Sequence, residues 1–188
     1  MAKINKQPVI ADNYKQYTII GETDKYMTDT TIFLSERINH RGIDCGSTPL
    51  ISFVSNDLRF EIERSQTDGQ SFKFKIYDSS LIHIPCYRFD SDGDAHLNPP
   101  GTPLPERQIS TPHFHKFNDA GIEYAYKTDD WVKNQDKLLS DFSLAFESFA
   151  REENIKYNKV PDICQSEGLT FLPDNTTLDP LQGEKFDE

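Results

Sequence analysis

Long hydrophobic runs are missing from this sequence of 188 residues. No apolar stretch approaches the roughly 18 residues that a membrane-spanning helix needs. Residues 1–6 also lack the hydrophobic core of a secretory signal peptide. These two absences predict a cytoplasmic protein that has no membrane partner.

Cysteine is scarce as well. The three cysteines, Cys45, Cys86 and Cys164, are scattered, odd in number and form no CxxC pair. This spacing disfavours a zinc knuckle or a disulfide framework and predicts isolated reduced thiols. The sequence also has no GxSxG nucleophile elbow and no glycine-rich phosphate loop of the Walker or Rossmann type. Several common enzyme classes are therefore excluded at the level of motifs.

Positive charge is the third deficit. The chain has 20 Lys and Arg against 31 Asp and Glu, a formal net charge of −11. A broad phosphate-binding surface needs clustered basic side chains, so this balance disfavours one. A compact enzyme site with a few local cations stays compatible with it. So does an acidic protein that occupies a basic groove on a partner.

Aromatic residues are plentiful, with 13 Phe and 8 Tyr, and apolar residues alternate with polar ones in several runs. Such alternation predicts half-buried strands, and the short turns between them favour antiparallel neighbours. We expect strands at residues 31–34, 50–55, 58–63, 72–76, 81–90, 112–118 and 122–127, with loops at 37–42 and 91–111. The predicted fold class is α+β, a mainly antiparallel sheet of about six strands with one C-terminal amphipathic helix.

One helix is predicted near residues 132–152. Apolar residues recur there at spacings of three and four and form a single stripe: Leu138, Phe142, Ala145, Phe146 and Phe149. Asp129 or Asp130 is expected to cap its start. Periodicity is weak near both ends of the chain. We therefore expect a polar N-terminal segment at 1–30, a single α+β domain at 31–155 and an acidic, loosely packed tail at 156–188.

Two of the five histidines, His113 and His115, stand two residues apart. Alternate side chains of a strand share a face, so both imidazoles are expected to point the same way. Two such imidazoles can chelate a metal ion, or one can act as an acid and the other as a base. His96 lies shortly upstream in a loop. His83, within an apolar run, is expected to be a core histidine, and His40 an exposed loop residue.

Further polar residues are expected to gather around this pair. Arg88 and Asp90 share a face of the preceding predicted strand. The proline-rich loop at 91–111 then carries His96 and Asn98 back towards the histidine pair. Long polar loops that end on strands commonly carry functional residues. If the two strands are neighbours, these side chains converge at one end of the sheet.

Three interpretations of this cluster stay open. In the first, three histidines bind a divalent metal ion as a cofactor, namely His96, His113 and His115. Asp90 or Asp94 then adds a carboxylate, and the mixture suits zinc, manganese or iron. In the second, no metal is needed: one histidine is a general base, another is a general acid, and Arg88 holds an anionic phosphate. That layout can cleave RNA through its own 2′-hydroxyl. In the third, the histidine pair is structural and bonds the backbone or Asp90.

The same residues resemble an uncharacterised bacterial domain-of-unknown-function family, whose members are small proteins of phages and mobile elements. The resemblance covers about residues 49–152 and rests on five matching places: Arg88-Phe89-Asp90, His96-Leu97-Asn98-Pro99, Pro112-His113-Phe114-His115, Gly121 and Tyr124-Ala125-Tyr126. Pro100 and Gly101 stand where the family has Asp-Gly, the loop before His113 is longer, and Tyr124 replaces Trp. The resemblance implies the position of a site rather than a named reaction.

A looser resemblance links the chain to toxins of toxin–antitoxin systems, which carry a similar arginine–aspartate run, a loop histidine and a closing histidine cluster. It implies a toxin-like ribonuclease or phosphodiesterase with five catalytic positions: Arg88, Asp90, His96, His113 and His115. RNA and a cognate antitoxin would then be its partners. The net charge supports a different hypothesis, a non-enzymatic acidic interaction protein that inhibits a host defence nuclease or mimics DNA. A metal-binding protein is the third hypothesis.

Overall fold

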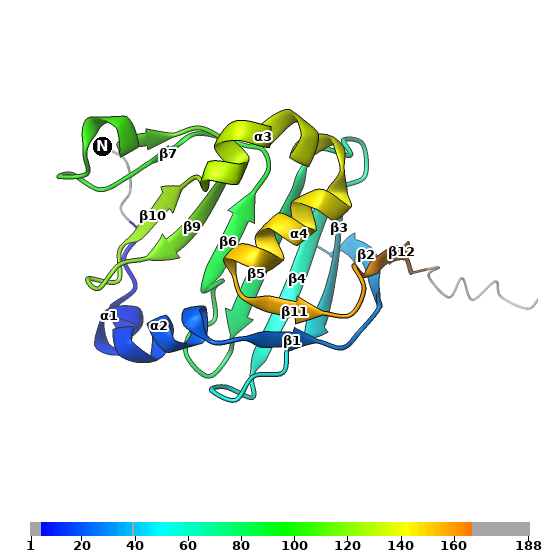
Figure 1. The fold of residues 1–188 in the computed structure, drawn as a ribbon, viewed down its shortest axis with the longest axis horizontal. Coiled ribbons are helices and arrows are strands. Elements are labelled where there is room, and N and C mark those ends of the chain that lie inside the picture. The colour runs from blue at the N-terminus through cyan, green and yellow to red at the C-terminus, as the bar shows by residue number, and fades with distance from the viewer. Residues whose placement is uncertain (1–4, 39, 167–188) are drawn as a thin grey trace, which may run out of the picture.

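The computed structural model describes residues 5–38 and 40–166. Eight strands form one sheet: β2 (Thr31–Arg37), β3 (His40–Pro49), β4 (Leu58–Ser65), β5 (Phe72–Asp78), β6 (Tyr87–Asp90), β9 (His113–Phe117), β10 (Glu123–Tyr126) and β12 (Asp162–Gln165). Their order is β10-β9-β6-β5-β4-β3-β2-β12 (Figure 1). Neighbouring strands are antiparallel, except that β12 runs parallel to β2. The prediction of an α+β fold with a mainly antiparallel sheet is therefore confirmed.

The strand predictions hold where apolar and charged residues alternate strictly, as in β4 and β5. The predicted strand at 50–55 is wrong, because the chain leaves the ladder after Pro49. The strand before it, β3, includes much of the predicted loop at 37–42 and forms a hairpin with β2. Its glycines and small polar residues conceal the two-residue period that the sequence analysis relied on.

The predicted strand at 81–90 is a strand only in its last four residues, β6. The side chain of Asp78 explains the difference. Its Oδ1 accepts hydrogen bonds from the backbone N–H of Ser80 at 2.9 Å and of Leu81 at 3.3 Å. These bonds hold the chain in a turn and keep the apolar run that follows away from the sheet. His83 lies in this run and is exposed, so the prediction of a core histidine is wrong.

The predicted helix at 132–152 is two helices, α3 (Asp129–Ser140) and α4 (Phe142–Glu152). Thr128, rather than Asp129 or Asp130, caps α3 by accepting a hydrogen bond from Trp131 N. The break comes at Asp141, whose side chain accepts from the N–H groups of Ser143 and Leu144 and so starts a new helix. The pair is not C-terminal either, because strands follow it.

The N-terminal segment contains two helices that the sequence analysis did not expect, α1 (Pro8–Asp12) and α2 (Tyr14–Glu22), followed by the strand β1 (Lys25–Met27). They contribute Ile10, Tyr17 and Ile20 to the hydrophobic core. The segment is also held to the β9–β10 turn, since Gln7 N donates to Gly121 O at 2.7 Å. Gly121 has a φ of +68°, and a Cβ there would collide with the Gln7 carbonyl oxygen. Glycine is therefore required at this close approach.

Part of the predicted tail is built into the fold. The strand β11 (Ile155–Tyr157) runs parallel to β1, and β12 adds to the edge of the large sheet. Residues 167–188, which make up most of the predicted acidic tail, lie outside the described residues. Within the described part of the chain, no helix has the length and apolar character to cross a membrane.

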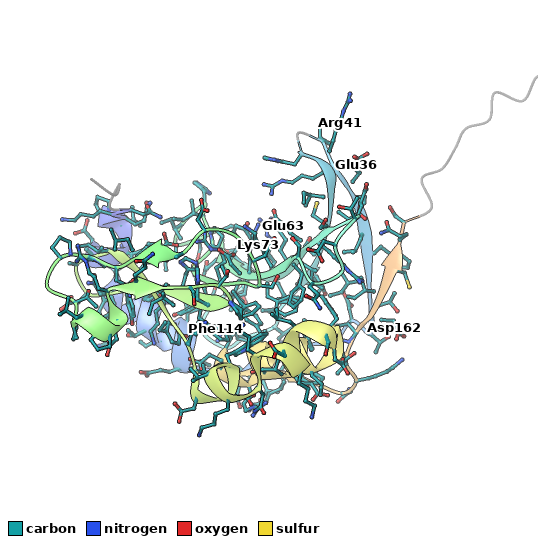
Figure 2. All side chains as sticks on the ribbon, turned by 90° about the horizontal axis from the view of Figure 1, so that it is seen from above. Glu36, Arg41, Glu63, Lys73, Phe114 and Asp162 are labelled. Atoms are coloured by element: carbon teal, nitrogen blue, oxygen red, sulfur yellow. The ribbon has the colours of Figure 1, made fainter. Side chains whose placement is uncertain are left out.

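The two faces of the large sheet differ sharply. We call one the helix-covered face, because α3 and α4 pack on it and its phenylalanines meet theirs. Phe74 lies 5.2 Å from Phe149 between ring centroids, and Phe60 lies 5.6 Å from Phe146. We call the other the charged face, defined by Glu61, Glu63, Lys73, Lys75, Arg88, Asp90, His113 and His115. Figure 2 shows Phe114 on the helix side and Glu63 and Lys73 on the opposite side.

Candidate functional site

Strands β6 and β9 are direct neighbours, as the convergence of the predicted site residues requires. Their antiparallel register pairs Arg88 with His115 and Asp90 with His113. Directly opposed residues share a face, so all four side chains lie on the charged face. The intervening Phe89 and Phe114 pair with each other and enter the core on the helix-covered face. Strict alternation in both strands thus builds the cluster.

Asp90 lies at the centre of this cluster. Its Oδ2 is 3.2 Å from His115 Nε2 and 3.3 Å from Arg88 Nε, and its Oδ1 is 3.9 Å from Lys73 Nζ. Burial of the carboxyl group by itself favours the neutral acid. The hydrogen bond from His115 and the positive charges of Arg88 and Lys73 outweigh burial and lower the pKa of Asp90 to about 2. Asp90 is therefore ionised at neutral pH.

His113 is only 2% exposed and packs against its neighbour, with 4.5 Å between the ring centroids of His113 and His115. Burial, reinforced by electrostatic repulsion from His115, lowers the pKa of His113 to about 4. The imidazole is thus neutral at physiological pH. Its Nδ1 is buried and finds no hydrogen-bond partner among the described residues.

His96 reaches the cluster from outside the sheet. It belongs to the strand β7 (His96–Leu97), which pairs with β8 (Gln108–Ile109) to close a loop that contains a short 3₁₀ helix, η1 (Leu104–Glu106). Its ring centroid lies 4.9 Å from that of His115 and 6.1 Å from that of His113. Burial and then the charge of His115 lower the pKa of His96. The three predicted histidines are thus adjacent in space, with His96 the most accessible.

Asn98 has a different task from the one predicted. Its Nδ2 donates to the carbonyl oxygens of Glu106 at 2.7 Å and of Ala125 at 2.8 Å, and its Oδ1 accepts from Ala125 N at 2.7 Å. These bonds occupy the whole amide. They fasten the 91–111 loop to the outer edge of β10 and satisfy backbone groups there that would otherwise lack a partner. Asn98 therefore positions the loop that carries His96.

Glu123 is a member of the cluster that the sequence analysis missed. Its Oε1 lies 3.5 Å from both Arg88 Nη2 and His115 Nδ1, and its Oε2 accepts from Asn5 Nδ2 at 2.8 Å. The signal was present, because Ala125 pairs with His115 and alternation places Glu123 on the same face. The strands at 112–118 and 122–127 were expected to be antiparallel neighbours, but the register that sets Ala125 opposite His115 follows only from the structure.

The donor atoms have the spacing of a metal site. Nitrogen atoms of His113 and His115 and a carboxylate oxygen of Asp90 all lie within 4.8 Å of one another, and all three residues are buried. Asp90 Oδ1, like His113 Nδ1, is a buried polar atom that lacks a hydrogen-bond partner in the described ranges. The predicted alternative ligand Asp94 is exposed and not part of this group. His96 adjoins the group without belonging to it.

A cavity of about 990 Å³ lies beside this cluster rather than at it. Residues of the 91–111 loop, Asn98 among them, line it together with Tyr124, Tyr126 and Lys127, and no histidine does. Its walls are proline, tyrosine and backbone, with few ionisable groups. The ionisable groups that could perform chemistry are therefore in the cluster and not in this cavity.

Comparisons with protein-family models, with curated proteins and with solved structures found no match. The resemblances described above remain predictions, and so do the mobile-element origin and the toxin-like activity that they imply.

Proposed function

We propose that Asp90, His113 and His115 bind a divalent metal ion. The observation that carries this proposal is the pair of buried atoms, Asp90 Oδ1 and His113 Nδ1, without hydrogen-bond partners in residues 5–38 and 40–166. Leaving a buried polar atom unpaired costs about 1–3 kcal/mol, and one bound ion would satisfy both. Two imidazoles and a carboxylate form a donor set that zinc, manganese and iron accept.

The protonation states of the donors suit a cation. Metal ligands must be deprotonated, so their affinity depends on the pKa of each group. The pKa of about 4 keeps the His113 imidazole neutral, and the pKa of about 2 keeps Asp90 ionised. Neither residue has to lose a proton at neutral pH to bind the ion.

Arg88 already places a positive charge beside these donors. Its Nη2 lies 3.0 Å from His115 Nε2 and 3.2 Å from His115 Nδ1. An arriving metal ion would repel the guanidinium. Glu123 offers Arg88 a second anionic partner at 3.5 Å, so the guanidinium can retain an ion pair while Asp90 turns to the metal.

Elemental analysis tests the metal site. The protein would be incubated with Zn²⁺, desalted and measured beside the variant His113→Ala/His115→Ala. We expect one ion per wild-type chain and none in the variant. The control is His40→Ala/His83→Ala, which removes two exposed histidines outside the cluster and should keep the ion. Equal metal content in all three proteins would contradict the proposal, and so would a thermal midpoint that a chelator does not lower.

We propose cleavage of RNA phosphodiester bonds through the 2′-hydroxyl group of the RNA as a second function of the same site. It is favoured by the accessible side of the cluster, where the Arg88 side chain is 29% exposed and His96 is half-buried. Arg88 can hold a phosphate oxygen. The neutral imidazole of His96 can take the proton from a 2′-hydroxyl group, whose oxygen then attacks the phosphorus and forms a cyclic phosphate. The P–O5′ bond breaks, and the leaving 5′-oxygen takes a proton from water. The buried pair His113 and His115 then holds the site together and does not meet the substrate.

Toxicity and RNA cleavage test this second function. Wild-type protein is expected to arrest growth on induction and to cleave RNA after purification. His96→Ala should slow cleavage by about 100-fold or more and still bind the metal, which separates this function from metal binding. His83→Ala serves as the control and should behave as wild type. Wild type and His96→Ala that are equally non-toxic and equally inactive on RNA would contradict the second function alone.

A further inference from the structure

A second cavity, separate from the histidine cluster, lies where α2, β9, β10 and the end of α4 approach one another. Its volume is about 310 Å³, which suits a small ligand. Five tyrosines line it: Tyr14, Tyr17, Tyr87, Tyr124 and Tyr126. Neither proposed function uses any of them. The aromatic rings that surround this cavity limit the kind of ligand that it can bind.

The ring faces favour positive charge, because the π-system of a tyrosine has a negative face. The chain itself demonstrates the effect. The ammonium group of Lys116 lies 4.1 Å from the ring centroid of Tyr126 and 5.7 Å from that of Tyr124. The cavity is thus able to hold an ammonium group against its tyrosines, and Lys116 reaches into it from the wall.

Glu153 is a buried carboxyl group in the cavity wall that has no direct ion pair among the described residues. It is 3% exposed and lines the cavity. The nearby buried cation, Lys25, donates from Nζ to the backbone oxygen of Glu153 at 2.8 Å and forms no salt bridge with its carboxylate within the described ranges. Burial raises the pKa of Glu153 to about 8, although the charge of Lys25 opposes this. A cation in the cavity would favour the ionised form of Glu153, and the resulting carboxylate would attract the cation.

The other charged residues of the cavity wall also favour a positively charged ligand. Glu22 and Glu152 also line the cavity with Glu153, and Lys116 is the lysine in the lining. The buried Lys25 lies 5.9 Å from the ring centroid of Tyr87, so three carboxyl groups stand against two lysines. Glu152 Oε1 accepts a hydrogen bond from the Tyr126 hydroxyl at 2.8 Å, which fixes that ring in the wall. Aromatic walls without histidine or cysteine suit an organic cation better than a metal ion.

We propose that this cavity binds a small organic cation that carries an ammonium group, with the tyrosine rings around the group and Glu153 as its counter-charge. Lys116 is then an internal competitor for the ring faces. The proposal does not depend on the metal site, since the two sites share no residue.

A titration with two probes of similar size tests the cavity, monitored by NMR shifts of the tyrosine rings. We expect tetramethylammonium to bind in about the millimolar range and neutral tert-butanol about tenfold more weakly or not at all. The titration would be run above the pKa of Glu153, where its carboxylate is ionised. Equal affinity for both probes, or shifts confined to tyrosines outside the cavity, would overturn the proposal.

Three variants sharpen the result. Glu153→Gln keeps the shape of the side chain, removes its charge and should weaken tetramethylammonium binding about tenfold. Lys116→Met removes the competing ammonium group and should strengthen binding several-fold, an effect that a purely structural lysine would not produce. Tyr26→Leu, outside the cavity, is the control. If Glu153→Gln does not fold by circular dichroism, Tyr124→Leu replaces it. Unchanged affinity in the folded variants would overturn the proposal.

Discussion

The two faces of the large sheet come from the same strands, yet the residues buried on them differ in what they need from their neighbours. On β9, Phe114 enters the helix-covered face with no exposed surface, while His113 enters the charged face with 2% exposed. Phe114 needs only apolar neighbours, and it has them. His113 needs hydrogen-bond partners, and its Nδ1 has none in the part of the chain described. Trp131 Nε1 and Asp78 Oδ2 are also unpaired in that part, so it is the grouping of such atoms with metal-binding side chains that marks the cluster.

The charged face also balances its charges along the strands. Lys75, which is 6% exposed, lies between Glu63 at 2.5 Å and Glu61 at 3.3 Å, and Arg37 pairs with Glu63 from the hairpin side. Buried ion pairs add little to stability but are costly to break. We infer that the helix-covered face provides most of the folding free energy. The functional residues are then expected on the charged face.

The largest effect is expected on the helix-covered face. Phe74 touches Phe60, Phe146 and Phe149, so Phe74→Ala leaves a cavity and should lower the free energy of unfolding by about 3–5 kcal/mol. Phe33→Ala, at a position that is 64% exposed on β2, is the control and should change it far less. Urea denaturation measures both. Similar losses would mean that the phenylalanine cluster is not the main source of stability.

A smaller loss is expected from the charged face. Lys75→Met removes the cation between Glu61 and Glu63 and should cost about 3 kcal/mol, because two partly buried carboxylates then repel each other. Lys73→Met is the matched control, since its ammonium lies 3.9 Å from Asp90 and is more exposed. It should cost about 0–1 kcal/mol. If both substitutions prove equally mild in urea denaturation, the charged face is more hydrated than its burial indicates.

The side-chain amide of Asn98 holds the 91–111 loop on the outer edge of β10. Asn98→Ala removes three hydrogen bonds and leaves two backbone groups of Ala125 unpaired, which should cost about 1–3 kcal/mol. The released loop should also become a better trypsin substrate after Arg107. Asn56→Ala, at an exposed turn position, is the control. Unchanged proteolysis at Arg107 would show that the loop is held by other contacts.

The smallest effect at neutral pH concerns His113. Its pKa is about 6.5 in an unfolded chain and about 4 in the folded one, so the unfolded chain binds the proton first as the pH falls. The contribution of His113 to stability is complete above pH 6.5 and is lost progressively towards pH 4. His113→Gln should flatten that part of the stability profile, measured by urea denaturation with chelator present, and His40→Gln should not. A profile that keeps its slope in His113→Gln would contradict the assigned cause.

Much of the candidate cluster was predictable, because alternation within a strand is a local property. The pairs Arg88 with Asp90 and His113 with His115 could be placed on shared faces from their spacing alone. Glu123 was not added, because the register between β9 and β10 decides which residues of β10 lie beside the histidine pair. Asn98 was identified as a site residue for its polarity, and only its contacts show that it fastens a loop.

Helices and irregular strands were harder to predict. The stripe from Leu138 to Phe149 predicted a helical region but not the break at Asp141, where a side-chain cap competes with continuation of the helix. The helices of the N-terminal segment are short, with five and nine residues. Tertiary burial of Ile10, Tyr17 and Ile20 stabilises them more than their own pattern does.

The sequence by itself determined the α+β class, the alternation of the central strands and the facing of the histidine pair, because these follow from the two-residue period of a strand. Only the tertiary structure decided that β6 lies next to β9, that Glu123 joins the cluster and that Tyr14 and Tyr126 share one cavity. Those contacts join residues far apart in the chain. Their formation depends on how the whole core packs, which no local pattern of residues encodes.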